Sequence, residues 1–219
     1  MSAQEKELSF AFRARYFKLE PTNGIPRQVW FVLHGYGQLA QYFIKNFQSF
    51  ADRGITVIAP EALSRFYLED VQSRARSGNN RVGATWMTRE NRLVDIDNYI
   101  RFLDNVYAKE TVDPAIPVTV LGFSQGAATA SRWVIDGKIN FDRLVLWAGI
   151  FPPDTNFETG KEILQKKKVI LAYGTKDPFL NDDRFAEMKT LSQKLNITPE
   201  TITFDGSHEI NQPALLKLI

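Results

Sequence analysis

The sequence predicts an α/β fold: a mostly parallel seven-stranded sheet with an antiparallel N-terminal edge strand and helices on both faces. Short runs rich in Val, Ile and Leu alternate along the chain with longer segments of helical periodicity. Most of the later runs are continuously apolar, which is typical of parallel strands that are buried on both faces. Each intervening helix is then expected to connect two parallel strands by a right-handed crossover.

Seven runs are the candidate strands, and four segments are the candidate helices. The first run alternates apolar and polar residues, so it is expected to form a half-exposed strand. The candidate strands are residues 8–17, 28–34, 55–60, 117–122, 142–149, 168–174 and 200–206. The candidate helices are residues 39–54, 88–108, 124–137 and 181–196, with a short closing helix at the C-terminus.

Residues 61–87 form the longest stretch without periodicity. It exceeds the usual length of a connection between elements, and long loops of this kind are often lids or binding loops. Because it follows the end of a candidate strand, we expect a lid or pocket wall rather than an inert insertion. The whole chain, residues 1–219, fits one α/β domain that carries this insertion.

The composition excludes several classes of protein. With no cysteine in the chain, a disulfide framework, a thiolate metal site and a cysteine nucleophile are excluded. The 27 Lys and Arg nearly balance the 25 Asp and Glu, so nothing favours a nucleic-acid partner. No apolar run approaches the roughly 18 to 20 residues that span a bilayer, and the charged start MSAQEKELSF lacks an apolar signal region. We therefore expect a cytoplasmic protein without stable membrane insertion.

The stretch GFSQGA, residues 122–127, places a serine between two glycines where an apolar strand joins a helix. A Gly-x-Ser-x-Gly pattern alone is a weak signal, but this context is that of a nucleophile elbow, a strained turn that exposes the serine hydroxyl. Gly122 and Gly126 fit where the strand and the helix would crowd a Cβ atom. We predict that Ser124 is a nucleophile rather than only a helix N-cap.

A serine hydroxyl needs a base with a pKa near neutrality, and the chain contains two histidines, His34 and His208. Enzymes with a nucleophile elbow order their triad as serine, acid and histidine, with the histidine after the last strand. His208 meets both conditions, whereas His34 precedes the serine and is expected to shape its own loop. Asp177, in YGTKDPF, lies on a strand-end loop between serine and base and is the predicted acid. The weaker competitors are Asp154, Asp182, Asp183 and Asp205.

Two backbone N–H groups are expected to form an oxyanion hole. Gln125 opens the helix after the serine, where amides and the positive end of the helix dipole face a developing oxyanion. In the stretch LHGYGQ, two glycines let the loop turn tightly, so that the amide of Tyr36 points into the same site. A nest for phosphate is the alternative use of this loop, but the motif contains no basic residue.

Aromatic and apolar side chains on the strand-end loops predict an apolar substrate pocket. For each of them, ordinary core packing is the alternative. The predicted lining residues are Phe66, Tyr67, Trp86, Met87, Phe151 and Phe179. Arginines crowd residues 61–92, where a solvated face is favoured over a site for an anionic head group.

The motifs LHGYG, GFSQGA, GTKDP and GSHEI, in this order, resemble the phospholipase/carboxylesterase family of α/β-hydrolases, which includes carboxylesterases and acyl-protein thioesterases. The likeness runs from about residue 28 to residue 210. The resemblance implies an α/β-hydrolase fold that hydrolyses acyl esters or thioesters without a cofactor. Carried onto this chain, it implies a triad of Ser124, Asp177 and His208, with oxyanion amides from Tyr36 and Gln125.

The chain departs from the family pattern around the pocket. The usual Trp-Phe-Asp reads Trp86-Met87-Thr88 here, and the His-Gly often found before the acid loop reads Tyr173-Gly174. Residues 61–87 match poorly, so the substrate stays open. Lysophospholipid or peptide hydrolysis with the same triad, or a non-catalytic binding protein on a hydrolase fold, are the alternatives. We expect a small-molecule acyl ester or thioester as substrate and no metal, and a homodimer is compatible with the sequence.

Overall fold

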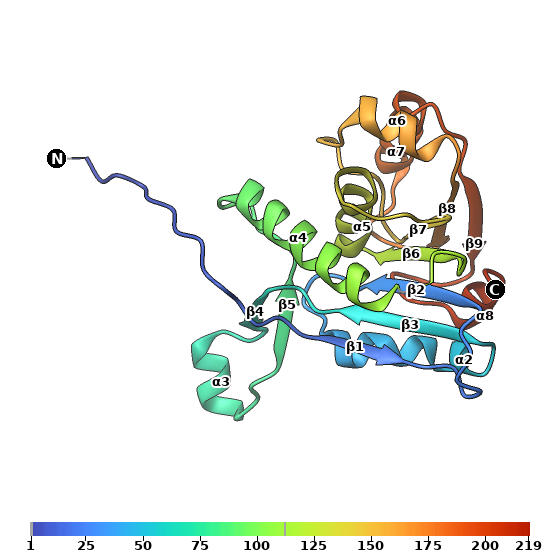
Figure 1. The fold of residues 1–219 in the computed structure, drawn as a ribbon. Helices are drawn as coiled ribbons and strands as arrows, with labels where there is room; N and C mark the ends of the chain where they lie inside the picture. Colours follow the sequence, from blue (N-terminus) through green and yellow to red (C-terminus); the bar gives the residue numbers. More distant parts are fainter. Residues whose placement is uncertain (1, 112) are drawn as a thin grey trace.

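The computed structural model describes residues 2–111 and 113–219, and it contains the predicted sheet (Figure 1). The edge strand β1 pairs with β3 in the antiparallel sense, and the other neighbouring pairs of this sheet are parallel. The mostly parallel sheet with an antiparallel N-terminal edge strand is therefore confirmed. In spatial order the strands are β1 (Tyr16–Leu19), β3 (Ile55–Pro60), β2 (Gln28–Leu33), β6 (Val118–Phe123), β7 (Arg143–Trp147), β8 (Lys168–Gly174) and β9 (Glu200–Phe204).

Helices cover both faces of the sheet, and the sheet separates the core into two clusters. Because side chains alternate along a strand, neighbouring residues of β2 reach opposite clusters: Phe31 packs on Trp133, and Trp30 on Phe50. One cluster includes residues of α4 (Arg92–Glu110), α5 (Gln125–Asp136), α6 (Phe157–Leu164) and α7 (Asp182–Lys194). The other includes residues of α1 (Ala40–Phe43), η1 (Ile44–Phe47), α2 (Gln48–Ala51) and α8 (Gln212–Leu216).

The prediction of a first strand over residues 8–17 is wrong for most of its length. The strand begins at Tyr16, whose partner is Pro60, the last residue of β3. The Arg15 carbonyl still accepts from the Glu61 N–H at 3.1 Å, but residues 8–14 have no strand beside them and run away from the sheet as an extended arm (Figure 1). Alternation favoured a strand here, but a strand also needs a neighbour to receive its hydrogen bonds.

The predicted insertion, residues 61–87, has secondary structure that its sequence did not reveal. It consists of β4 (Ser64–Tyr67), α3 (Val71–Ser77) and β5 (Val82–Thr85), with β4 and β5 paired in the antiparallel sense (Figure 1). Each strand is only four residues long, which is too short for a clear period. The eight-residue helix α6 was also missed. None of the helices in the described ranges combines the length and the apolar character that a membrane span requires.

Candidate active site

Ser124 lies at the junction of β6 and α5, at the carboxyl edge of the parallel strands. Its backbone has φ 55° and ψ −118°, a conformation that L residues rarely adopt and that is typical of strain held by the surroundings. A Cβ atom on Gly122 would lie 2.1 Å from the Gly126 carbonyl oxygen, and one on Gly126 would lie 2.3 Å from that of Leu33. Only glycine fits at these two positions, so the sequence allows the elbow to close and leaves Ser124 partly accessible.

Asp177 and His208 meet at the same edge, although 31 positions separate them. The Oδ2 atom of Asp177 lies 2.8 Å from Nδ1 of His208, and Oδ1 accepts a hydrogen bond from the Phe179 N–H at 2.9 Å. The Asp177 side chain is fully buried, whereas that of His208 is 20% exposed. A buried carboxylate held on both oxygens can orient an imidazole that still faces the solvent-accessible site.

The loops after β8 and β9 are packed backbone to backbone, which explains why the acid and the histidine meet. The Lys176 N–H donates to the Gly206 carbonyl at 2.9 Å, and the Thr175 N–H donates to the Phe204 carbonyl at 2.9 Å. A Cβ atom on Gly174 would lie 2.3 Å from the Gly206 oxygen, so this approach depends on glycine. Parallel neighbours β8 and β9 end side by side, and the two loops inherit that proximity.

Two aromatic rings pack on the His208 imidazole, one from the elbow and one from the loop that carries Asp177. The Phe123 ring, one residue before Ser124, lies 5.0 Å from it, and the Phe179 ring lies 4.8 Å from it. The indole nitrogen of Trp147 donates to the Glu209 carbonyl at 2.7 Å and anchors the histidine loop to β7. The structure thus brings together the three predicted triad residues at one edge of the sheet.

The predicted oxyanion loop, residues 34–38, lies directly against the elbow. A Cβ atom on Gly35 would lie 3.2 Å from the Ser124 Cβ. The N–H groups on either side of Tyr36 are engaged, since Gly35 donates to Gln38 Oε1 at 2.8 Å and Gly37 to the Ala84 carbonyl at 2.9 Å. Within residues 2–111 and 113–219, the Tyr36 N–H has no hydrogen-bond partner.

The second predicted donor, the Gln125 N–H, belongs to the first residue of α5 and has no carbonyl of its own helix to bond. Two amides beside the serine are therefore free to bind a ligand oxygen, which is the arrangement of an oxyanion hole.

His34 is fully buried behind this loop and bonded on both ring nitrogens. The Ala62 N–H donates to Nε2 at 3.1 Å, so the proton sits on Nδ1, which lies 2.8 Å from the Gly35 carbonyl. Burial lowers the pKa of His34 below its usual value and favours this neutral form. The Trp86 ring stacks at 5.2 Å, and its indole nitrogen donates to the His34 carbonyl at 2.8 Å. These contacts support the structural role expected of His34, since they tie the loops after β2 and β3 together.

The predicted pocket residues fall into two groups. Phe66 stacks on the exposed Tyr36 ring at 5.1 Å, and Tyr67 and Phe179 are also exposed. In contrast, Phe151 is 0% exposed and Trp86 is 2% exposed, and both belong to the core cluster. A ring without accessible surface has nothing to offer a substrate.

Met87 is half-buried, with Arg132 Nη1 at 3.5 Å from its sulfur. It lies between the exposed rim residues and the core.

The arginines of residues 61–92 are mostly engaged within the protein. Arg65 pairs with Glu61, Arg81 with Glu69, and Arg92 with Asp154. The guanidinium of Arg74 lies 3.9 Å from the Tyr67 ring centre. These partners favour the solvated-face interpretation over a site for an anionic head group.

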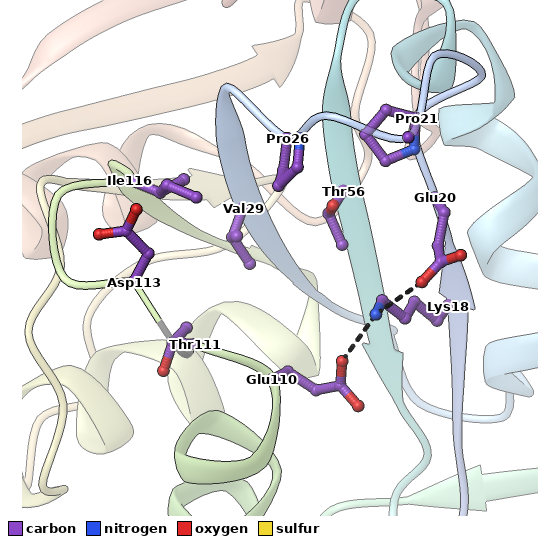
Figure 2. Close-up of a pocket in the computed structure, with 11 residues that line it drawn as sticks. Lys18, Glu20, Pro21, Pro26, Val29, Thr56, Glu110, Thr111, Asp113 and Ile116 are labelled. Atoms are coloured by element: carbon purple, nitrogen blue, oxygen red, sulfur yellow. Dashed lines mark ion pairs between the residues drawn. The ribbon is translucent and has the colours of Figure 1, made fainter.

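One surface hollow lies beside the predicted oxyanion loop, and another lies at the opposite end of the strands. The first, of about 590 Å³, opens between α1 and the insertion, and its lining combines apolar Leu39, Phe43, Leu68 and Val82 with polar Gln41, Asn46, Asn80 and Arg81. The other, of about 320 Å³, lies at the amino ends of β2 and β3, away from the catalytic edge (Figure 2). In that second hollow, Lys18 is paired with Glu20 and with Glu110.

Sequence reasoning missed the side chains of Gln38 and Gln125. Gln38 caps the Gly35 N–H of its own loop, and Gln125 bonds to residues 85–87 near the end of the insertion. The glutamine of GFSQGA was assigned only a backbone role, because no local signal pairs it with a segment about 40 positions away. Only the packing of the insertion onto the elbow could have revealed this contact.

The sheet order, the elbow at the carboxyl edge and the Asp177–His208 pair are those of a hydrolase of the α/β class. Residues 27–215 match the family described as Serine hydrolase (FSH1). The chain belongs to this serine hydrolase family. No curated protein matches the chain.

Several solved structures are similar to the chain over nearly its whole length. Esterase PE8 is 21% identical over 94% of this chain and 96% of its own, with a TM-score of 0.68. Acyl-protein thioesterase 2 of Zea mays is 17% identical over the same shares, with a TM-score of 0.68. The carboxylesterase of Bacillus cereus is 18% identical over 94% of this chain and 91% of its own, with a TM-score of 0.63. At such identities these matches establish the fold, so the predicted α/β-hydrolase fold is confirmed. The predicted resemblance to a serine hydrolase family is confirmed by the family match over residues 27–215.

Proposed function

We propose that the protein hydrolyses acyl esters or thioesters through an acyl-enzyme intermediate, with Ser124, His208 and Asp177 as its catalytic triad. The observation that carries the proposal is the 2.8 Å contact between Asp177 and His208 beside a serine held at φ 55°. A strained serine is expected where strain keeps a nucleophile accessible. Membership of a serine hydrolase family supports the same reaction class.

In the proposed acylation step, Ser124 Oγ attacks the acyl carbonyl while Nε2 of His208 takes the hydroxyl proton. The Asp177 carboxylate accepts a hydrogen bond from the Nδ1–H of His208, which sets the tautomer and stabilises the imidazolium while the carboxylate stays ionised. The amides of Tyr36 and Gln125 bind the oxyanion of the tetrahedral intermediate. His208 then gives its proton to the leaving alcohol or thiol. Removal of one oxyanion donor would cost on the order of 3 kcal/mol of transition-state stabilisation.

Deacylation repeats these steps with water in place of the serine. His208 takes a proton from the water as it attacks the acyl carbonyl, the same two amides bind the second oxyanion, and Ser124 leaves with the proton returned by His208. This cycle needs only groups of the chain and water.

The surface around Ser124 favours an apolar acyl or leaving group. Tyr36, Phe66 and Phe179 line the rim, and the hollow of about 590 Å³ beside Gly37 has the size of a small-molecule site. Its one arginine, Arg81, is already paired with Glu69. We therefore propose uncharged acyl chains as the better substrates.

A fluorophosphonate label read by intact mass tests the nucleophile. The wild type should gain one adduct and Ser124→Ala none, whereas Ser77→Ala, on exposed α3, should label like the wild type. If Ser124→Ala still labels or keeps full esterase activity, the proposed nucleophile is wrong. If the wild type neither labels nor hydrolyses short p-nitrophenyl esters, a non-catalytic binding protein becomes the better reading.

The substrate class needs a panel of acyl compounds. p-Nitrophenyl esters with acyl chains from about two to sixteen carbons would give the chain-length profile of the apolar site. Acyl thioesters, lysophospholipids and peptides in the same assay distinguish the alternatives that share the triad. Highest kcat/KM for a lysophospholipid or a peptide would replace the proposed simple ester or thioester.

A further inference from the structure

The Gln125 side chain joins the nucleophile elbow to the end of the insertion. Its Oε1 accepts from the Trp86 N–H at 3.1 Å, and its Nε2 donates to the Met87 carbonyl at 3.0 Å. Nε2 also donates to Thr85 Oγ1 at 3.0 Å, and the Thr85 hydroxyl donates in turn to the Met87 carbonyl at 2.8 Å. Both ends of one amide are thus used, so only one orientation of the side chain satisfies this network.

The same insertion is bonded to the oxyanion loop by its backbone. The Gly37 N–H donates to the Ala84 carbonyl at 2.9 Å, and the Ala84 N–H donates to the Gln38 carbonyl at 3.1 Å. A Cβ atom on Gly83 would lie 2.4 Å from the Gly37 oxygen, so strand and loop are in direct backbone contact. The strand β5 therefore touches the segment that carries the Tyr36 amide.

Trp86 adds a third connection between the two sides. Its N–H bonds to Gln125, while its indole nitrogen donates to the His34 carbonyl and its ring stacks on His34. Trp86 is buried, so these bonds are shielded from competing water. Elbow, oxyanion loop and the end of the insertion form one connected unit.

We propose that residues 83–87, clamped by the Gln125 side chain, hold the two amides of the oxyanion hole at a fixed separation. One amide belongs to Gln125 and the other to Tyr36, and β5 is bonded to both segments, through Thr85 to Gln125 and through Ala84 to Gly37. The Gln125 side chain and Gly83 are then positioning groups, which act through the hole and not on the substrate. The proposal rests on the proposed function, since it explains how the oxyanion hole of that enzyme is held in position.

One consequence concerns movement of the insertion. If residues 83–87 are part of the catalytic frame, they cannot swing away as a lid without opening the oxyanion hole. Any closing movement is then confined to the exposed segment 68–81, which includes α3. This narrows the expected lid from residues 61–87 to its tip.

Gln125→Met tests the clamp, because methionine keeps the length of the side chain and removes the amide. We expect kcat to fall about 100-fold with KM within twofold, as for a catalytic group misplaced by about 1 Å. Active sites are counted by the fluorophosphonate adduct, so that loss of folded protein is not read as loss of rate. The matched control is Gln193→Met on the exposed surface of α7, which should retain wild-type kcat.

A comparison of esters with thionoesters separates misplacement of the hole from other damage. Sulfur accepts hydrogen bonds weakly, so a thionoester gains little from the two amides. We expect the ester-to-thionoester ratio of kcat/KM to fall roughly tenfold or more in Gln125→Met and to stay unchanged in Gln193→Met. Wild-type kcat in Gln125→Met, or a lower kcat with an unchanged ratio, would overturn the proposal.

Hydrogen exchange tests the clamp without any turnover. The Gly37 and Ala84 amides should exchange roughly tenfold faster in Gln125→Met, while amides of β7 keep their protection. Gly83→Ala, which pushes on Gly37, should reproduce the changed ester-to-thionoester ratio if Gln125→Met does not fold. Unchanged exchange at both amides would overturn the clamp, whereas failure of the proposed hydrolase function would appear as an unlabelled wild type.

Discussion

The catalytic edge and the tip of the insertion, residues 68–81, are packed in opposite ways. At the edge, a Cβ atom on Gly122 or on Gly174 would lie 2.1 Å or 2.3 Å from a carbonyl oxygen. At the tip, a Cβ atom on Gly78 would meet nothing within 4 Å, and α3 has no buried residue. The structure is close-packed where reacting groups must keep their positions and open where it borders the hollow beside the oxyanion loop.

This difference separates two properties of the enzyme. Catalytic geometry depends on backbone contacts that no side chain can replace, so the edge tolerates little change. The tip has few buried contacts and can vary in sequence or position at small cost to the fold. We therefore expect substitutions of the close-packed glycines at the edge to affect rate and folding together, and substitutions at the tip to affect substrate choice.

The largest effect is expected for Asp177→Asn at the edge. In asparagine the amide oxygen is expected to keep the hydrogen bond from the Phe179 N–H, so the NH2 group faces His208 and donates to Nδ1. The imidazole then carries its proton on Nε2, which is the wrong tautomer for a general base. We expect kcat to fall by about 10⁴-fold with little change in thermal stability. Esterase assays and a melting curve check both parts. A loss of less than about tenfold would contradict the assignment of Asp177 as the acid.

Gly122→Ala tests the close packing of the elbow. The new methyl group would overlap the Gly126 backbone, which cannot move away as a flexible side chain could. We expect destabilisation on the order of 3 kcal/mol or more, together with loss of labelling at Ser124. Chemical denaturation measures the change in unfolding free energy. Wild-type stability of this variant would show that the edge is looser than its contacts indicate.

The pH dependence of stability tests burial behind the oxyanion loop. Burial lowers the pKa of His34 below 6.5, so the unfolded chain binds a proton before the native protein does. The contribution of neutral His34 to the free energy of unfolding is fully present above pH 6.5. It is lost as the pH falls, with a limiting slope of about 1.4 kcal/mol per pH unit. We expect His34→Gln to be less stable at pH 8 and to show a shallower fall between pH 7 and 5. Equal slopes for variant and wild type would exclude this role.

The smallest effect is expected for Gly78→Ala at the tip, the same substitution in the open region. Gly78 ends α3 with φ 67°, so alanine is strained there although it has space. We expect a cost of about 1 kcal/mol, confined to α3, and unchanged kcat. Chemical denaturation measures the stability cost and esterase assays measure kcat, both in parallel with Gly122→Ala. A large fall in kcat would show that the tip belongs to the catalytic frame.

Prediction from sequence succeeded where local pattern and fold rules agree. Runs of apolar and β-branched residues located six of the seven strands of the large sheet. Five of these six are mostly buried, as strands covered on both faces are, whereas β9 is a largely exposed edge strand. The rule that strand-end loops meet at one edge brought Asp177 and His208 together, and the structure places them 2.8 Å apart. The first strand failed, because pairing depends on where β3 ends and not on the alternation of residues 8–17.

The sequence by itself determined the sheet, the elbow and the identity of the triad candidates, because each depends on a residue type at a fixed place along a strand. Tertiary structure alone decided how the insertion folds, which predicted pocket residues are exposed, and that the Gln125 side chain clamps residues 85–87. Contacts between segments some 40 positions apart depend on the packing of whole elements. No local pattern records them, and the shape of the proposed oxyanion hole depends on them.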